Sequence, residues 1–130
     1  MSLNEPSFTS SQVIGGGSLS WTERTVGDGT NNWRGITSSA DGTKLAAVVN
    51  GGNIWTSTDS GATWTENTSV GATKNWYDIA SSDDFTKLAA VVKNGNIWMS
   101  TDSGANWTEN TSISATKDWR AVTSSSDGTK

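Results

Sequence analysis

Residues 57–64 read STDSGATW and residues 100–107 read STDSGANW, so an eight-residue segment returns after 43 positions with one change. All 8 tryptophans of the chain follow the same period. They fall into three classes: Trp21, Trp64 and Trp107; Trp33, Trp76 and Trp119; and Trp55 and Trp98. Self-similarity at a fixed period of this size is the mark of a repeat architecture.

The repeat divides the chain into units. Residues 33–75 and 76–118 are identical at 31 of 43 positions, which makes them two whole repeats. Residues 119–130 begin a third copy, and residues 21–32 match the end of a unit. Residues 1–20 form an atypical segment that we expect to fill part of this split unit, although Glu5-Pro6 stands where the repeat has Val-Val.

Each unit is predicted to hold four short strands. Apolar runs rich in β-branched residues, such as Leu45–Val49, are typical of strands that are buried on both faces. In the first unit the strands are expected at Trp33–Ser38, Leu45–Val49, Ile54–Ser57 and Trp64–Thr68. In the second they are expected at Trp76–Ser81, Leu88–Val92, Ile97–Ser100 and Trp107–Thr111, and the third unit starts with Trp119–Ser124.

The turn between the first two strands has a recognisable sequence. Asp41-Gly42 and Asp127-Gly128 are hairpin signals, because glycine tolerates positive φ and aspartate bonds to its own turn backbone. The second unit has Asp84-Phe85 at this place, which predicts a different turn there.

Four antiparallel strands in about 43 residues match the size of a β-propeller blade. The fold class is therefore expected to be all-β, with an open solenoid of β-meanders as the alternative. Propellers close with about four to eight blades, whereas this chain holds three blade-lengths. We expect two chains to form a six-bladed homodimer; the other interpretation is that the chain is a piece of a longer propeller.

The repeated segment matches the pattern SxDxGxxW and so resembles the Asp-box (BNR) repeat, found in sialidases, xyloglucanase-like glycoside hydrolases, sortilin-type receptors and a photosystem II assembly factor. The resemblance covers nearly all of residues 21–130 and implies propeller blades. The matching residues are Ser57, Asp59, Gly61 and Trp64, and Ser100, Asp102, Gly104 and Trp107.

The box is expected to be structural. Its aspartate can accept hydrogen bonds from the turn that follows, its serine adds a hydroxyl, and its glycine permits a left-handed backbone. The tryptophan is expected to fold under the hairpin. One carboxylate per box falls short of the 6–8 oxygen ligands of calcium, so no metal site is predicted.

Composition excludes several classes of function. The chain has 130 residues, net charge −4, no Cys and no His, which removes thiolate metal sites and the commonest base at neutral pH. A pI near 4.6 argues against a nucleic-acid partner. No long apolar run and no signal peptide are visible, so we expect a soluble protein with no membrane partner, and the compartment stays open. No cofactor is expected.

Catalysis is not predicted. A sialidase-like enzyme needs clustered arginines, a Tyr nucleophile and an acid, but Arg34, Tyr77 and Arg120 share one repeat position and are expected on successive blades, without converging. No pair of carboxylates stands out for glycoside hydrolysis.

A non-catalytic binding or scaffold module is the preferred interpretation, with carbohydrate as a candidate ligand. The candidate binding residues are Trp55, Trp98, Arg34, Tyr77 and Arg120. The two tryptophans are the best candidates for exposed aromatic side chains, with a place in the core as the alternative. Trp33, Trp76 and Trp119 are expected in the core. The alternatives are a fragment of a sialidase-like or xyloglucanase-like glycoside hydrolase, and a structural or designed repeat with no ligand.

Overall fold

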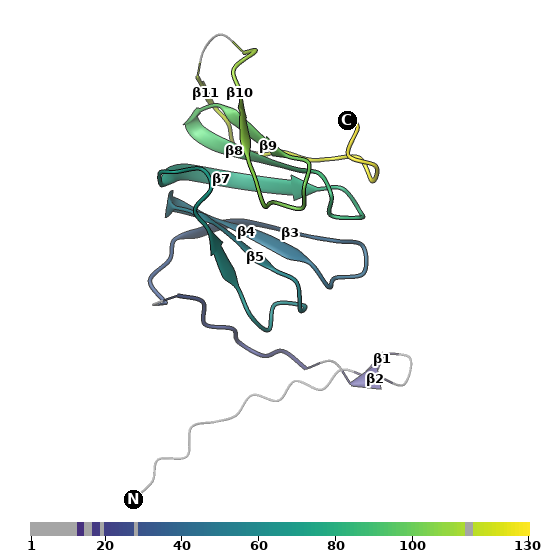
Figure 1. The fold of residues 1–130 in the computed structure, drawn as a ribbon. Helices are drawn as coiled ribbons and strands as arrows, with labels where there is room; N and C mark the ends of the chain where they lie inside the picture. The colour runs from purple at the N-terminus through teal and green to yellow at the C-terminus, as the bar shows by residue number, and fades with distance from the viewer. Residues whose placement is uncertain (1–12, 15–16, 19, 28, 114–115) are drawn as a thin grey trace, which may run out of the picture.

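The computed structural model describes residues 13–14, 17–18, 20–27, 29–113 and 116–130. The elements in this part of the chain are all strands. Two four-stranded antiparallel meanders are stacked one on the other, and strand pairing between them and with the C-terminal segment links them into one nine-stranded sheet. The C-terminal segment runs along the second meander (Figure 1). Most of the segment predicted to be atypical, residues 1–20, lies outside the described residues.

The first blade consists of β3 (Trp33–Ser38), β4 (Leu45–Gly52), β5 (Ile54–Ser57) and β6 (Thr65–Asn67). The strands pair in order as a meander, with Ile36 opposite Ala47 and Ala47 opposite Trp55. Because β4 is the second strand and pairs on both sides, its apolar run is buried from Ala46 to Val49, as the sequence predicts.

The second blade repeats this arrangement with β7 (Lys74–Ser81), β8 (Leu88–Gly95), β9 (Ile97–Ser100) and β10 (Thr108–Asn110). The blades are joined where β4 pairs briefly with β7. The same joint recurs where β8 pairs with β11 (Lys117–Asp118). A separate hairpin, β1 (Val13–Ile14) and β2 (Gly17–Ser18), precedes the blades. The predicted strands of both whole repeats are confirmed, with small differences at their ends.

The core lies between the two blades. Ala46, Val48 and Ile54 of the first blade pack into one cluster with side chains of the second blade. The partners from the second blade include Trp76, Ile79, Phe85, Leu88 and Trp107. Packing of sheet on sheet is what a meander with two apolar faces requires, because one sheet cannot cover both of its own faces.

The predicted difference in the second hairpin turn is wrong. Phe85 has φ 64°, close to the 71° of Gly42 and the 63° of Gly128, so all three units form the same turn. In each turn a serine hydroxyl and the backbone N–H two residues after the aspartate bond to its carboxylate; for Asp84 these donors are Ser82 and Thr86. Phe85 tolerates the left-handed backbone because its ring is buried in the core between the blades.

The prediction of a strand at Trp119–Ser124 is also wrong. Only Lys117–Asp118 is a strand here. The residues after it are irregular, although by the repeat they correspond to residues 76–81 of β7. Val122 N–H bonds to the Asp78 carboxylate rather than to a ladder carbonyl. In the two whole blades, the first strand forms its backbone hydrogen bonds with the second strand. The described residues of the third unit contain no second strand, so this pairing is missing there.

Candidate functional site

Both Asp-boxes form the expected turn between the third and fourth strands. Thr63 N–H donates to Asp59 Oδ1 at 2.8 Å, and Asn106 N–H donates to Asp102 Oδ1 at 2.9 Å. The serine at the start of each box receives the N–H of the box glycine at 2.9 Å. Each box tryptophan donates its indole N–H to the carbonyl of that glycine, at 3.1 Å for Trp64 and 3.0 Å for Trp107. The boxes are therefore closed, self-satisfied hairpins.

Hydrogen bonding keeps these aspartates ionised. The Thr63 hydroxyl, the Thr63 N–H and the Ser57 hydroxyl lower the pKa of Asp59 to about 2, and bonds from Asn106 lower the pKa of Asp102. In the hairpin turns, bonds from serine and threonine lower the pKa of Asp41, Asp84 and Asp127 to about 2. A carboxyl group with so low a pKa is a poor proton donor at neutral pH.

The boxes also hold neighbouring blades together. Asn67, at the end of β6, donates to the carbonyls of Gly104 and Ala105 in the second box. Within a blade, Ser60 N–H bonds to Thr43 O and Ser103 N–H bonds to Thr86 O, which ties each box to its hairpin turn. The box residues thus position the blades and leave little hydrogen-bonding capacity for a ligand.

The structure brings Arg34, Tyr77 and Arg120 together. They lie on successive blades, as predicted, but the expectation that they do not converge is wrong. The guanidinium carbons of Arg34 and Arg120 lie 5.5 Å and 5.1 Å from the centroid of the Tyr77 ring. Arg120 Nη1 also donates to the Tyr77 hydroxyl at 3.2 Å. We refer to these three residues as the Arg–Tyr–Arg stack.

The surroundings of the stack are charged. Arg120 forms an ion pair of 2.7 Å with Asp118, and both side chains are about half exposed. The hydrogen bond from Arg120, followed by its charge and those of Arg34 and Lys93, lowers the pKa of Tyr77. Sequence reasoning considered Asp118 only as one of several carboxylates and did not connect Asp118 or Lys93 with these residues. The two come together only through the pairing of β8 with β11, in which Asp118 lies opposite Lys93.

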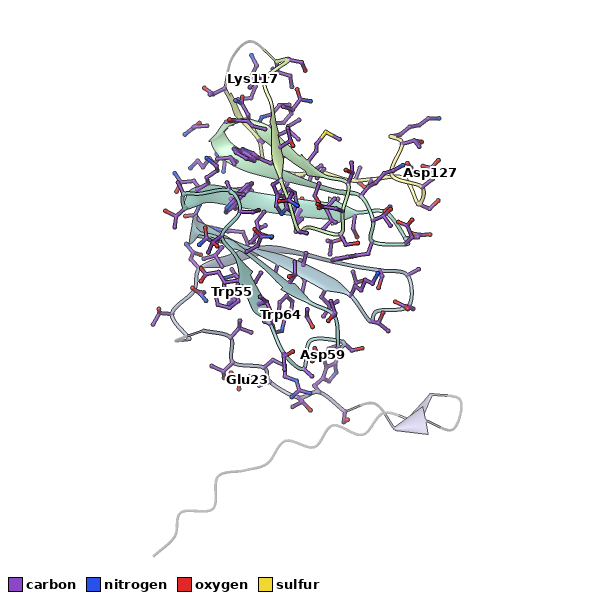
Figure 2. The ribbon with its side chains drawn as sticks, viewed as in Figure 1. Glu23, Trp55, Asp59, Trp64, Lys117 and Asp127 are labelled. Carbon is purple, nitrogen blue, oxygen red and sulfur yellow. The ribbon has the colours of Figure 1, made fainter. Side chains whose placement is uncertain are left out.

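The tryptophans differ from the predictions at two positions. Trp98 is buried rather than exposed, and Lys74 Nζ lies 4.6 Å from the centroid of its ring. Trp55 is half-buried on the first blade (Figure 2). Trp76 is buried and Trp119 half-buried, whereas Trp33 is 39% exposed, because no blade covers its side of β3 in this structure.

A hollow of about 450 Å³ opens on that same side of the first blade. Its walls include Trp33, Ile36, Leu45 and Trp64, together with Arg24 of the segment before β3. Figure 2 shows Trp64 on the side of the blade that faces the segment carrying Glu23. The hollow is mainly apolar, unlike the stack.

The part of the chain that the structure describes lacks two further features. It contains no group of three or more His, Cys, Asp or Glu side chains suited to hold a metal ion. No helix among the same residues is long and apolar enough to cross a membrane.

Known structures resemble this fold. The chain aligns with the Niastella koreensis GH74 enzyme with a TM-score of 0.54 and 28% identity, over 71% of this chain and 13% of that protein. It aligns with YCF48 from Cyanidioschyzon merolae with a TM-score of 0.56 and 19% identity, over 67% of this chain and 26% of that protein. The fold is that of β-propeller blades. No protein-family model and no curated protein matches the chain.

Proposed function

We propose that the chain is a non-catalytic β-propeller module that binds carbohydrate through the Arg–Tyr–Arg stack. The observation that carries the proposal is the contact of Arg34, Tyr77 and Arg120 across three successive repeat units. Both guanidinium groups are exposed. Contact with the Tyr77 ring restricts both arginine side chains, which reduces the entropy lost when a ligand binds.

The chemistry of the stack favours an acidic sugar. A guanidinium group can bind a carboxylate through two parallel hydrogen bonds, and the Tyr77 hydroxyl can form a hydrogen bond with a sugar hydroxyl. The chain as a whole has a net charge of −4. Arg34, Arg120 and Lys93 all act on Tyr77, and Asp118 pairs with Arg120, so the group still has a local excess of positive charge. Support for carbohydrate as the ligand class comes from the similarity to the GH74 enzyme.

The state of the carboxylates supports a non-catalytic role. Glycoside hydrolysis requires a protonated carboxyl group beside a second carboxylate. In this chain, hydrogen bonds within turns lower the pKa of four aspartates to about 2: Asp41, Asp59, Asp84 and Asp127. These aspartates therefore stabilise turns as ionised groups. Glu66 and Glu109 each accept a hydrogen bond from an asparagine of their own blade, at 2.9 Å and 3.0 Å.

Calorimetric titration tests the proposal. The probes are an oligogalacturonate and a neutral cello-oligosaccharide of the same length. We expect the acidic probe to bind, and Arg34→Ala to weaken its binding about 10- to 100-fold, since one charge-assisted hydrogen bond contributes about 1.5–3 kcal/mol. Lys44→Ala, which removes a positive charge beyond the far end of β3, should leave the affinity unchanged. Failure of both probes to bind, or equal binding by Arg34→Ala, would contradict the proposal.

A second candidate function is a fragment of a glycoside hydrolase. The observation in its favour is the 28% identity with the GH74 enzyme. Release of reducing sugar from xyloglucan, or of a fluorophore from a sialoside, distinguishes the two functions, because the binding module has no turnover. The third interpretation, a repeat with no ligand, predicts no heat in any of these titrations.

A further inference from the structure

The two whole repeats differ most in what covers their front faces. The front face is formed by four apolar side chains: Trp33, Ile36, Leu45 and Trp64 in the first blade, and Trp76, Ile79, Leu88 and Trp107 in the second. Trp76 and Ile79 are 0% and 3% exposed, but Trp33 and Ile36 are 39% and 63% exposed. The sequences are nearly the same, so the difference comes from the blade that lies in front of the second face and is missing from the first.

The interface between the two blades shows what the open face is built to receive. The second front face is covered by the back of the first blade, with Ala46, Val48 and Ile54 in the shared cluster. Hydrogen bonds cross the interface at the turn tips, where Ala40 N–H donates to Asp83 O at 2.8 Å. Asp83 N–H donates in turn to Ser126 O at 2.8 Å. The same backbone hydrogen bond therefore links successive blades at positions 40, 83 and 126, which are 43 residues apart. We refer to this series as the turn ladder.

Two tryptophans are left over from the blade pattern. Each whole blade pairs its first-strand tryptophan with its box tryptophan: Trp33 with Trp64 at a centroid distance of 6.4 Å, and Trp76 with Trp107 at 6.5 Å. By the repeat, the remaining pair is Trp119 and Trp21. Trp21 is 95% exposed, and no contact between the two rings occurs within the described chain.

We propose that a second copy of this chain covers the open front face and that the two copies share blades. Residues 119–130 of one copy and the segment around Trp21 of the other form a composite blade, in which Trp119 pairs with Trp21 of the second copy. The front face of the second copy's first blade packs behind this composite blade.

The turn ladder supplies a specific contact to test. Continued by the same step, Ser126 N–H of one copy donates to Ala40 O of the other, as Ala40 donates to Asp83 within one chain. This inference concerns assembly and is independent of the proposed carbohydrate ligand. All three positions of the ladder are exposed, so substitutions there leave the core intact.

Disulfide trapping tests this contact, because the chain has no cysteine of its own. Ala40→Cys and Ser126→Cys are mixed and oxidised, and a covalent dimer is expected in the mixture at several times the level of either variant alone. Asp83→Cys with Ser126→Cys in one chain is the matched control, since this pair has the same relationship within a chain.

A second variant tests the face itself. Ile36→Glu places a charge on the open front face and should reduce the yield of covalent dimer at least tenfold, whereas Ile36→Val should not. The proposal is wrong if the mixture yields no more covalent dimer than the single variants, or if a variant with both Ala40→Cys and Ser126→Cys closes only within one chain.

Discussion

Residues in the left-handed region occur in the hairpin turns and the Asp-box turns of both described repeats, and Phe85 is the least expected of them. A bulky residue at φ 64° costs about 1–2 kcal/mol relative to the right-handed region. The buried ring offsets this cost, since full burial of a phenylalanine side chain contributes about 1.5–3 kcal/mol. The sequence could not predict this outcome, because the turn signal Asp-Gly is absent and the burial depends on the neighbouring blade.

Phe85→Gly separates the two effects. We expect a net loss of about 1–4 kcal/mol in the free energy of unfolding, because the loss of a buried ring, about 3–5 kcal/mol for Phe→Ala, exceeds the relief of backbone strain. Chemical denaturation of the parent and the variant measures this difference in the free energy of unfolding. Gly42→Ala is the control, since it adds strain at φ 71° in open space and should cost about 1 kcal/mol. A Phe85→Gly protein as stable as the parent would show that the ring does not stabilise the turn.

The Asp-box carboxylate is expected to act on stability alone. Asp102→Ala removes the acceptor of Asn106 N–H and of the Ser100 hydroxyl, so the melting temperature should fall by several degrees. Asp102→Asn retains one acceptor oxygen, so its melting temperature should fall less than that of Asp102→Ala. Differential scanning calorimetry measures both variants. Unchanged melting together with lost carbohydrate binding would mean that the box belongs to the binding site.

Strands within the whole repeats could be predicted from the sequence, because periodic apolar runs and turn residues act locally. β3, β5 and β9 have the predicted bounds. The segment 119–124 could not be predicted correctly, because a strand depends on its pairing partner as much as on its own residues. The same limit applies to the site: the repeat placed Arg34, Tyr77 and Arg120 on successive blades, but their contact depends on how closely the blades stack.

The turns should make the strands sensitive to acid. Hydrogen bonds lower the pKa of Asp41, Asp59, Asp84 and Asp127 from 3.8 to about 2 in the folded chain. A folded pKa below the unfolded value contributes stability that is complete above the unfolded pKa and is lost as the pH falls through the folded pKa.

The melting temperature should therefore be nearly constant from pH 7 to about pH 5 and fall steadily between about pH 4 and pH 2. Circular dichroism across this range checks it. Asp59→Asn should flatten the acid limb, because it removes one of the titrating groups. A melting temperature that rises toward pH 2 would contradict the hydrogen-bonding account of these turns.

At the scale of the whole molecule, the fold is a stack of blades that buries one front face and leaves the other open. Trp33 and Ile36 are exposed while Trp76 and Ile79 are buried, because only the second blade has a neighbour on this side. The sequence predicted blades by their period, but it could not show which face lacks a neighbour, since the two repeats are nearly identical. The proposed shared-blade dimer is argued from that asymmetry.

The absolute mass of the parent chain in solution, measured by light scattering during size-exclusion chromatography at micromolar concentration, tests the shared-blade dimer most directly. The account predicts about 27 kDa, twice the 13.7 kDa of one chain. A mass of 13.7 kDa would contradict it and would mean that the open front face of the first blade has no second copy on it.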